Sequence, residues 1–212
     1  MEQEVPNKPW KKVYLIVPPT GKYIREERCQ TPVKKLHTVA LRPPMDLLYM
    51  AASLELDGIE CLIKDFPAHD YTWDHFRDDL HSFQPDAVVL SITTPTLFDD
   101  MKAAKIAKEI NPEIVTVTKG AHFIKLDKRS IAEYPHLDVI MRGEYEETIR
   151  ELSQGKEYHG IAGITFRHNG EPQQNPERGL LHSSKIFIME YIISGNCILI
   201  NLKTQESWIV LL

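Results

Sequence analysis

The 212-residue sequence lacks the features that mark secreted, redox and membrane proteins. Its three cysteines, Cys29, Cys61 and Cys197, are too far apart for a metal knuckle or a Cys-x-x-Cys pair, and their odd number does not suggest a secreted disulfide framework. No apolar run reaches the roughly 20 residues that span a bilayer, and the first ten residues lack the apolar core of a signal peptide. We therefore expect a cytoplasmic protein without membrane association.

Several chemical signatures are also missing. Lys and Arg number 25 against 30 Asp and Glu, giving a net charge of −5, so no basic footprint for nucleic acid is present. The chain has no Gly-x-Gly-x-x-Gly, no Gly-x-x-x-x-Gly-Lys-Ser/Thr and no Gly-x-Ser-x-Gly segment after an expected strand. Its nine histidines form no His-x-x-x-His pair. These absences argue against nucleic-acid binding, dinucleotide or nucleoside triphosphate binding, an α/β-hydrolase nucleophile and a metal site built by the protein.

One stretch, Asp86-Ala-Val-Val-Leu-Ser-Ile-Thr-Thr94, organises the rest of the chain. Its unbroken, β-branched apolar run predicts a strand that is buried on both faces, as at the centre of a parallel sheet. The run ends in the hydroxyl residues Ser91, Thr93 and Thr94. Ligands of open α/β sheets bind beyond the carboxyl ends of the strands, so these hydroxyls are candidate ligand contacts. They could equally satisfy the backbone at a strand end.

Strand and helix patterns alternate along the chain, which predicts an α/β, doubly wound and mainly parallel five-stranded sheet of flavodoxin-like or Rossmann-like type. The expected strands are 13–17, 59–66, 86–94, 114–118 and 137–141. The expected helices are 45–57, 72–83, 97–110, 127–134 and 144–152. Glu60 and Lys64 interrupt the second strand as at a sheet edge. The predicted strand order is therefore 2-1-3-4-5, with a pocket between the first and third strands.

Three segments lie outside this alternation. Residues 18–44 form a connection much longer than a usual strand-to-helix loop, as lids and binding loops often do. Asn169-Gly170 favours a type I′ turn, so residues 160–178 are expected to form a linker with a C-terminal β-hairpin. The pattern changes at Gly179. We therefore divide the chain into an α/β domain, 10–178, and a divergent C-terminal tail, 179–212.

Four segments follow one another in a recognisable order: Arg42-Pro-Pro-Met-Asp-Leu-Leu-Tyr-Met-Ala-Ala-Ser-Leu54, Ser91-Ile-Thr-Thr-Pro-Thr96, Val117-Thr-Lys-Gly-Ala-His122 and Arg142-Gly-Glu-Tyr-Glu-Glu-Thr148. Together they resemble the cobalamin-binding domain of cobalamin-dependent radical S-adenosylmethionine (radical SAM) enzymes. Members of that family have a Pro-Pro helix start, a Ser/Thr-rich end of the third strand, a Gly-Gly-Pro-His turn and a Gly-Glu-x-Glu segment in the same order. The resemblance covers about residues 10–178, including the hairpin. It implies cobalamin as the cofactor.

The resemblance also implies which residues contact cobalamin. Ser91, Thr93 and Thr94 would hold its nucleotide tail, Gly120 would let that tail pass close to the backbone, and Gly143 with Glu144 would line the crevice. The full set of candidate cofactor-binding residues is Pro44, Ser91, Thr93, Thr94, Gly120, His122, Gly143 and Glu144. For Gly120, Gly143 and Glu144, the plainer interpretation is a turn residue or a helix start.

The chain departs from the family pattern in several places. Lys119 stands where the family usually has Gly, and Ala121 where it has Pro. No Asp-x-His-x-x-Gly segment follows the first strand, and His37 lies in no such frame, so we predict that no histidine binds cobalt and assign no metal ligand. No Cys-x-x-x-Cys-x-x-Cys triplet is present. An iron-sulfur cluster needs closely placed thiolates, so neither a cluster nor S-adenosylmethionine is expected to bind this chain.

These observations predict a cobalamin-binding module that presents its cofactor to a radical SAM catalytic domain or subunit. The family consists of enzymes, but no catalytic residue is assigned here and catalysis by this chain stays open. One alternative is a non-catalytic interaction or sensory domain with the same fold. The other is an inactive, truncated remnant, and the divergent tail from Gly179 favours this alternative over a complete enzyme.

Overall fold

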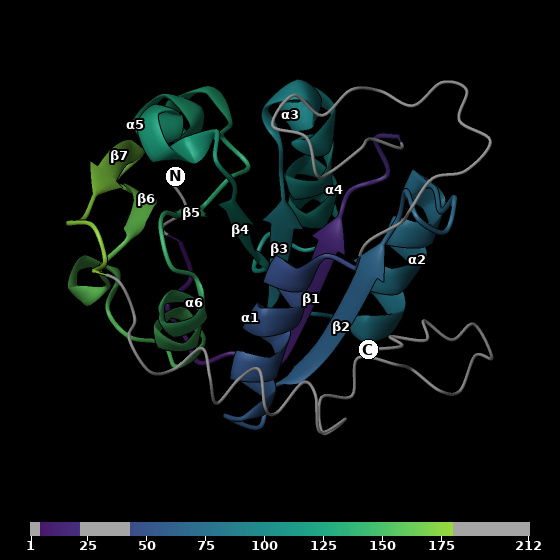
Figure 1. The fold of residues 1–212 in the computed structure, drawn as a ribbon, viewed down its shortest axis with the longest axis horizontal. Helices are drawn as coiled ribbons and strands as arrows, with labels where there is room; N and C mark the ends of the chain where they lie inside the picture. Colours follow the sequence, from purple (N-terminus) through teal and green to yellow (C-terminus); the bar gives the residue numbers. More distant parts are fainter. Residues whose placement is uncertain (1–4, 22–42, 180–212) are drawn as a thin grey trace.

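The computed structural model describes residues 5–21 and 43–179, which form a helix-covered β-sheet (Figure 1). Most of the long connection, 22–42, and nearly all of the tail, 180–212, lie outside the described residues. His37, Cys29 and Cys197 lie outside them as well. No helix within the described ranges is long and apolar enough to cross a bilayer.

The sheet has seven strands in the order β2-β1-β3-β4-β5-β6-β7. The strands are β1 (Lys12–Val17), β2 (Glu60–Asp65), β3 (Ala87–Ser91), β4 (Val115–Lys119), β5 (Val139–Met141), β6 (Ile164–His168) and β7 (Glu171–Gln174). The first five are parallel, which confirms the predicted order 2-1-3-4-5. The chain continues from β1 outward to β2 and then crosses back to β3. The topological switch point therefore lies between β1 and β3.

The predicted hairpin is confirmed, and its strands extend the same sheet. β6 pairs antiparallel with β5, and β7 pairs antiparallel with β6. Asn169 and Gly170 both have positive φ, 49° and 79°. A two-residue type I′ turn requires that combination, because its twist matches the twist of the two strands that it joins.

Helices cover both faces of the sheet. They are α1 (Met45–Glu55), α2 (Trp73–Phe83), α3 (Leu97–Asp100), α4 (Lys102–Ile110), α5 (Phe123–Glu133) and α6 (Glu146–Ser153), with 3-10 turns η1 (Thr94–Thr96) and η2 (Tyr158–Gly160). The helix predicted over 97–110 is divided at Met101 into α3 and α4. The predicted helix 127–134 begins earlier, at Phe123. Asp127 and Ser130 are buried on its inner face and interrupt the apolar period that would have predicted this start.

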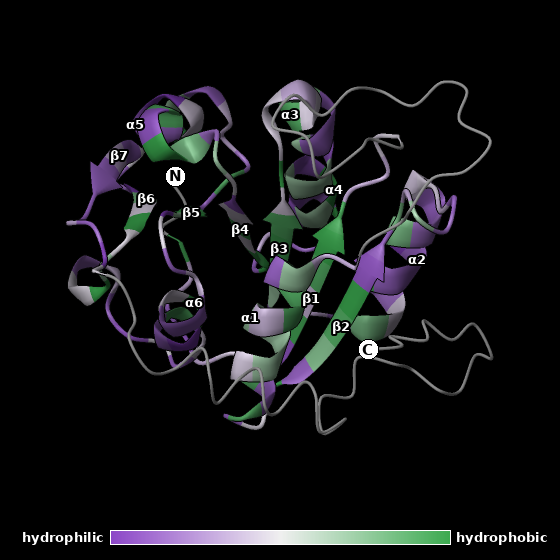
Figure 2. Cartoon of the chain, in the orientation of Figure 1, coloured by the Kyte–Doolittle hydropathy of each residue, from purple (hydrophilic) through white to green (hydrophobic). Residues whose placement is uncertain are grey.

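Two apolar cores lie on opposite sides of the sheet. Side chains of α1 and α6 pack on one face and those of α2, α4 and α5 on the other. Within β3, Ala87 and Val89 face the first core, whereas Val88 and Leu90 face the second. Burial on both faces explains the unbroken apolar run of this strand. Figure 2 shows the result as green central strands, in contrast to the purple β7 at the edge.

Buried polar contacts attach the hairpin to the parallel part of the sheet. The Arg142 Nε atom after β5 lies 3.2 Å from an Asp127 carboxylate oxygen of α5, and both side chains are almost fully buried. The Arg142 guanidinium also donates to the backbone oxygens of Ile164 and Asn175, at 3.1 and 2.5 Å. Thr165 of β6 donates to the same Asp127 carboxylate. These contacts couple α5 and β5 to the hairpin.

Candidate functional site

A cavity of about 430 Å³ opens at the switch point of the sheet. Its walls come from the carboxyl ends of β1, β3 and β4, from the start of α1 and from the turn after β2. The lining residues are Val17, Thr20, Gly21, Pro43, Pro44, Met45, Asp46, Pro67, Ser91, Ile92, Thr93, Thr96, Asp100, Lys119, Gly120 and Ala121. A polar crevice at this position is where open α/β sheets bind their ligands.

Asp46, Ser91 and Lys119 form a polar cluster on one wall of the cavity. Ser91 and Lys119 are register partners at the ends of β3 and β4. The Lys119 ammonium forms an ion pair with the Asp46 carboxylate, to which the Ser91 hydroxyl donates at 3.2 Å. Asp46 lies in the first turn of α1. The cluster thus links the start of α1 to the carboxyl ends of β3 and β4.

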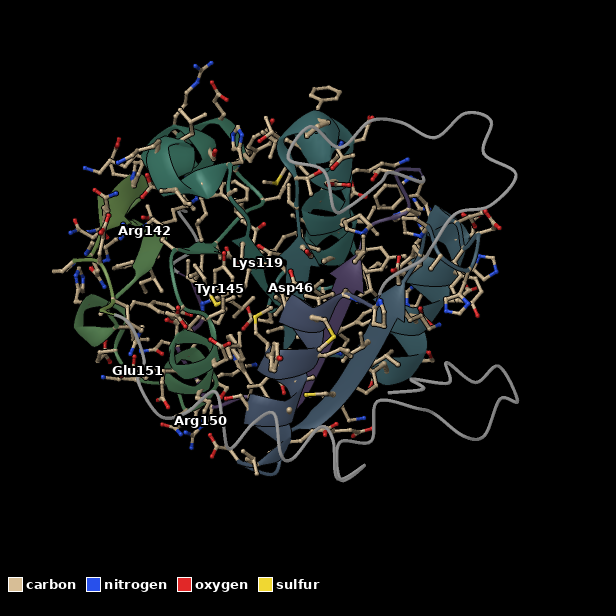
Figure 3. All side chains as sticks on the ribbon, in the orientation of Figure 1. Asp46, Lys119, Arg142, Tyr145, Arg150 and Glu151 are labelled. Carbon is tan, nitrogen blue, oxygen red and sulfur yellow. The ribbon has the colours of Figure 1, made fainter. Side chains whose placement is uncertain are left out.

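Tyr145 lies beside this cluster. The Lys119 ammonium is 5.4 Å from the centre of the Tyr145 ring, a cation–π distance. Burial, followed by the nearby charges of Glu146 and Glu144, raises the pKa of the Tyr145 phenol. Figure 3 shows Asp46, Lys119 and Tyr145 close together near the centre of the view, with Tyr145 on the side of α6. The Lys119 side chain is only 8% exposed, so its charge acts in a partly dehydrated setting.

Asp100 forms a second polar group on another wall. It receives hydrogen bonds from the hydroxyls of Thr20, after β1, and Thr96, in η1, both at 2.5 Å. Burial raises the pKa of the Asp100 carboxyl to about 6, although both hydroxyls favour the charged form. Thr93 shares a 2.8 Å hydrogen bond with Thr96. The network joins the segment after β1 to the turn after β3.

Gly120 is the first residue after β4 and lines the cavity. Its φ is +147°, and a Cβ atom added there would lie 2.2 Å from the Ile92 carbonyl oxygen. The protein's own backbone therefore requires glycine at this position. The contact with Ile92 explains the glycine without any ligand. A role of Gly120 in admitting the nucleotide tail of cobalamin therefore stays a prediction.

The residues singled out from the sequence fall into two groups. Pro44, Ser91, Thr93 and Gly120 line the cavity. The residues outside its lining are Thr94, His122, Gly143 and Glu144. Thr94 is exposed at the start of η1, and His122 immediately precedes α5, with its ring against Phe123. Gly143 and Glu144 lie between β5 and α6.

Sequence reasoning missed Asp46, Thr20, Thr96 and Asp100 as residues of the cavity wall. Asp46 and Thr96 both lie within segments that carry the family resemblance, which was the available signal. Thr20 and Asp100 carry no motif, and they meet only because the fold places α3 beside the segment that follows β1. Lys119 was singled out as a departure from the family pattern, but its pairing with Asp46 was not predicted.

Within residues 5–21 and 43–179, no group of three or more His, Cys, Asp or Glu side chains is arranged to hold a metal ion. His122 is half-buried, and burial with the nearby Arg129 charge lowers the pKa of its imidazole. Among the described residues that line the cavity, the polar side-chain groups are hydroxyls, carboxyls and one ammonium. Such a set can hydrogen-bond hydroxyls, amides and phosphate oxygens of an organic ligand.

A family model described as the B12 binding domain matches residues 38–153. This region contains α1 to α6 and the strands from β2 to β5. It includes the wall built by Asp46, Ser91 and Lys119.

Curated proteins with similar sequences are much longer than this chain. An uncharacterised methyltransferase, PH0819, of Pyrococcus horikoshii is 32% identical over 176 residues, which are 81% of this chain and 36% of that protein. The anaerobic magnesium-protoporphyrin IX monomethyl ester cyclase of Rubrivivax gelatinosus is 32% identical over 52% of this chain and 20% of its own length. The chain thus spans between a fifth and about a third of these relatives.

A solved structure shares the fold. The radical S-adenosylmethionine methyltransferase TsrM from Kitasatospora setae, with cobalamin and a 4Fe-4S cluster bound, aligns with a TM-score of 0.59. The alignment covers 82% of this chain and 30% of TsrM at 14% identity. At that identity the likeness establishes the architecture of the sheet and its helices alone.

Proposed function

This chain belongs to the B12-binding domain family, and from that premise we propose that it binds cobalamin with the nucleotide tail in the cavity at the switch point. The observation that carries the proposal is the position of the polar wall. Ser91 and Lys119, at the ends of β3 and β4, and Thr93, in the turn after β3, line a cavity to which the start of α1 also contributes.

The residues present suit such a ligand. The nucleotide tail of cobalamin carries ribose hydroxyls and a phosphodiester, which need hydrogen-bond donors and a positive charge. The hydroxyls of Ser91 and Thr93 and the Lys119 ammonium can supply these. The whole cofactor is larger than the cavity of about 430 Å³, so the corrin ring would extend beyond it.

We propose no histidine ligand to cobalt from this chain. His122 is not among the residues that line the cavity. When bound, cobalamin supplies a cobalt-centred methyl or electron carrier. The contribution of this chain would be to hold the tail, to orient the corrin ring and to leave the cobalt face open to another domain.

The catalytic partner is proposed from the relatives. TsrM is described with cobalamin and a 4Fe-4S cluster bound, and PH0819 is described as a methyltransferase. We propose that this module presents cobalamin to a radical SAM domain or subunit. In that assembly the radical would be generated at a cluster that this module does not hold.

The test is to incubate the purified chain with hydroxocobalamin, to remove free cofactor by gel filtration and to record the visible spectrum of the protein fraction. Retention of about one corrinoid per chain supports the proposal. A colourless fraction from protein whose circular dichroism shows native α/β structure contradicts it. That result would favour the alternative of an interaction domain or an inactive remnant.

A further inference from the structure

We propose that Lys119 recognises the phosphodiester of the nucleotide tail, and that Asp46 holds its ammonium until the ligand takes over this ion pair. The inference rests on the proposed cobalamin binding and assigns a specificity-determining residue within it. It would make the chain select corrinoids that carry a nucleotide tail over those that lack one.

The first support is the balance of charge in the cavity. The ionisable side chains among its described lining residues are Asp46, Asp100 and Lys119. Two of these are acids, so an anionic ligand would meet net repulsion without the lysine. Lys119 is the single cation among these lining residues, and a phosphodiester that enters the cavity needs it.

The second support is how Lys119 is held. Its position in register with Ser91 places its side chain at the end of β4, and the Tyr145 ring lies 5.4 Å from the ammonium on another side. Because the side chain is only 8% exposed, little solvent screens the charge. An ammonium that is already positioned and partly dehydrated loses less entropy and hydration when it binds an anion.

The third support is the nature of its present partner. The Asp46 side chain is 33% exposed, far more than that of Lys119. Asp46 lies in the first turn of α1, where the helix dipole favours a negative charge. In this proposal the ligand phosphate replaces the carboxylate beside Lys119, and the partly exposed Asp46 side chain turns toward solvent. The Ser91 hydroxyl, which now donates to Asp46 at 3.2 Å, can donate to the phosphate instead.

The experiment compares two corrinoids and three variants by equilibrium dialysis. The corrinoids are hydroxocobalamin and diaquacobinamide, which has the corrin ring but no nucleotide. The variants are Lys119→Met, Asp46→Asn and the double variant with both substitutions. Lys105→Met removes an exposed lysine of α4 and serves as the matched control.

The proposal expects the wild type to prefer hydroxocobalamin and Lys119→Met to lose about tenfold to a hundredfold in affinity for it, as for a lost charge-assisted hydrogen bond. Affinity for diaquacobinamide should hardly change. Asp46→Asn, by removing the competing carboxylate, should bind hydroxocobalamin a few-fold more tightly. The double variant should lose the preference, and because it removes both charges it leaves neither buried alone.

Two results overturn the inference while the proposed function stands. One is cobalamin binding by Lys119→Met that equals the wild type. The other is an equal loss in Asp46→Asn and Lys119→Met, which would mean that the ion pair acts only by holding α1 on the sheet. A wild type that binds neither corrinoid contradicts the proposed function itself, so the two failures are distinguishable.

Discussion

Gly120 lies against the carbonyl oxygen of Ile92, so close that a Cβ atom on Gly120 would be 2.2 Å from that oxygen. The two residues follow β4 and β3, and the backbone of Ile92 also donates to the carbonyl of Lys119 at 3.2 Å. The turn at the base of the cavity is thus set by contact between two backbone segments. Its shape does not depend on a ligand.

Gly120→Ala should therefore destabilise the folded chain by about 2 kcal/mol or more, because it combines backbone strain with atomic overlap. Urea denaturation followed by circular dichroism measures the change. Gly58→Ala is the matched control, since Gly58 has φ +78° but no atom within 4 Å of its added Cβ. It should cost about 1 kcal/mol. Equal effects of the two substitutions would show that the overlap with Ile92 contributes nothing.

Asp100 should make stability depend on pH. Burial raises the pKa of its carboxyl from 3.8 to about 6 in the folded chain, so folding favours the protonated form. The protonated Asp100 carboxyl therefore contributes its whole share of the free energy of unfolding below about pH 4, and this share is lost as the pH rises through 6. The loss should be on the order of 2 kcal/mol.

The measurement for Asp100 is a series of urea titrations between pH 4 and pH 7. Asp100→Asn should remove this part of the pH dependence, whereas Asp78→Asn, at an exposed position of α2, should keep the wild-type profile. Parallel profiles for the wild type and Asp100→Asn would refute the assignment to this carboxyl.

Arg142→Met should destabilise the chain by about 3 to 5 kcal/mol, because it leaves the Asp127 carboxylate buried without its cation. Thr165 and Gln174, which also donate to Asp127, would only partly compensate. Thermal unfolding measures the loss. Arg129→Met, which breaks an exposed pair with Glu133 on the same helix, should cost less than about 1 kcal/mol. Similar losses in both variants would mean that burial of the Arg142 pair is unimportant.

Ser91→Ala should weaken hydroxocobalamin binding by about threefold to tenfold, as expected for one lost neutral hydrogen bond. Spectral titration of the purified variants provides the affinities. Ser82→Ala, on an exposed position of α2, should bind as the wild type does. Unchanged affinity in Ser91→Ala would exclude this hydroxyl from the binding site.

The sequence by itself determined the sheet order and the hairpin turn, because both are recorded in local patterns. The unbroken apolar run of β3 indicates burial on both faces. Glu60 and Lys64 mark β2 as an edge strand, and the structure places it at the edge. Asn169-Gly170 indicates a type I′ turn because few other pairs tolerate positive φ at both positions. The same patterns placed Ser91 and Thr93 at the end of a central strand.

The tertiary structure decided what those positions meet. Lys119 and Asp46 belong to different elements, and only the packing of α1 on the sheet brings their charges together. Asp100 of α3 and Thr20, which follows β1, are likewise brought together by tertiary packing, on another wall of the cavity. Asp127 has the sequence character of a solvent-facing helix residue, yet it is buried because Arg142 lies opposite. Such pairings depend on distant segments, and no local pattern records them.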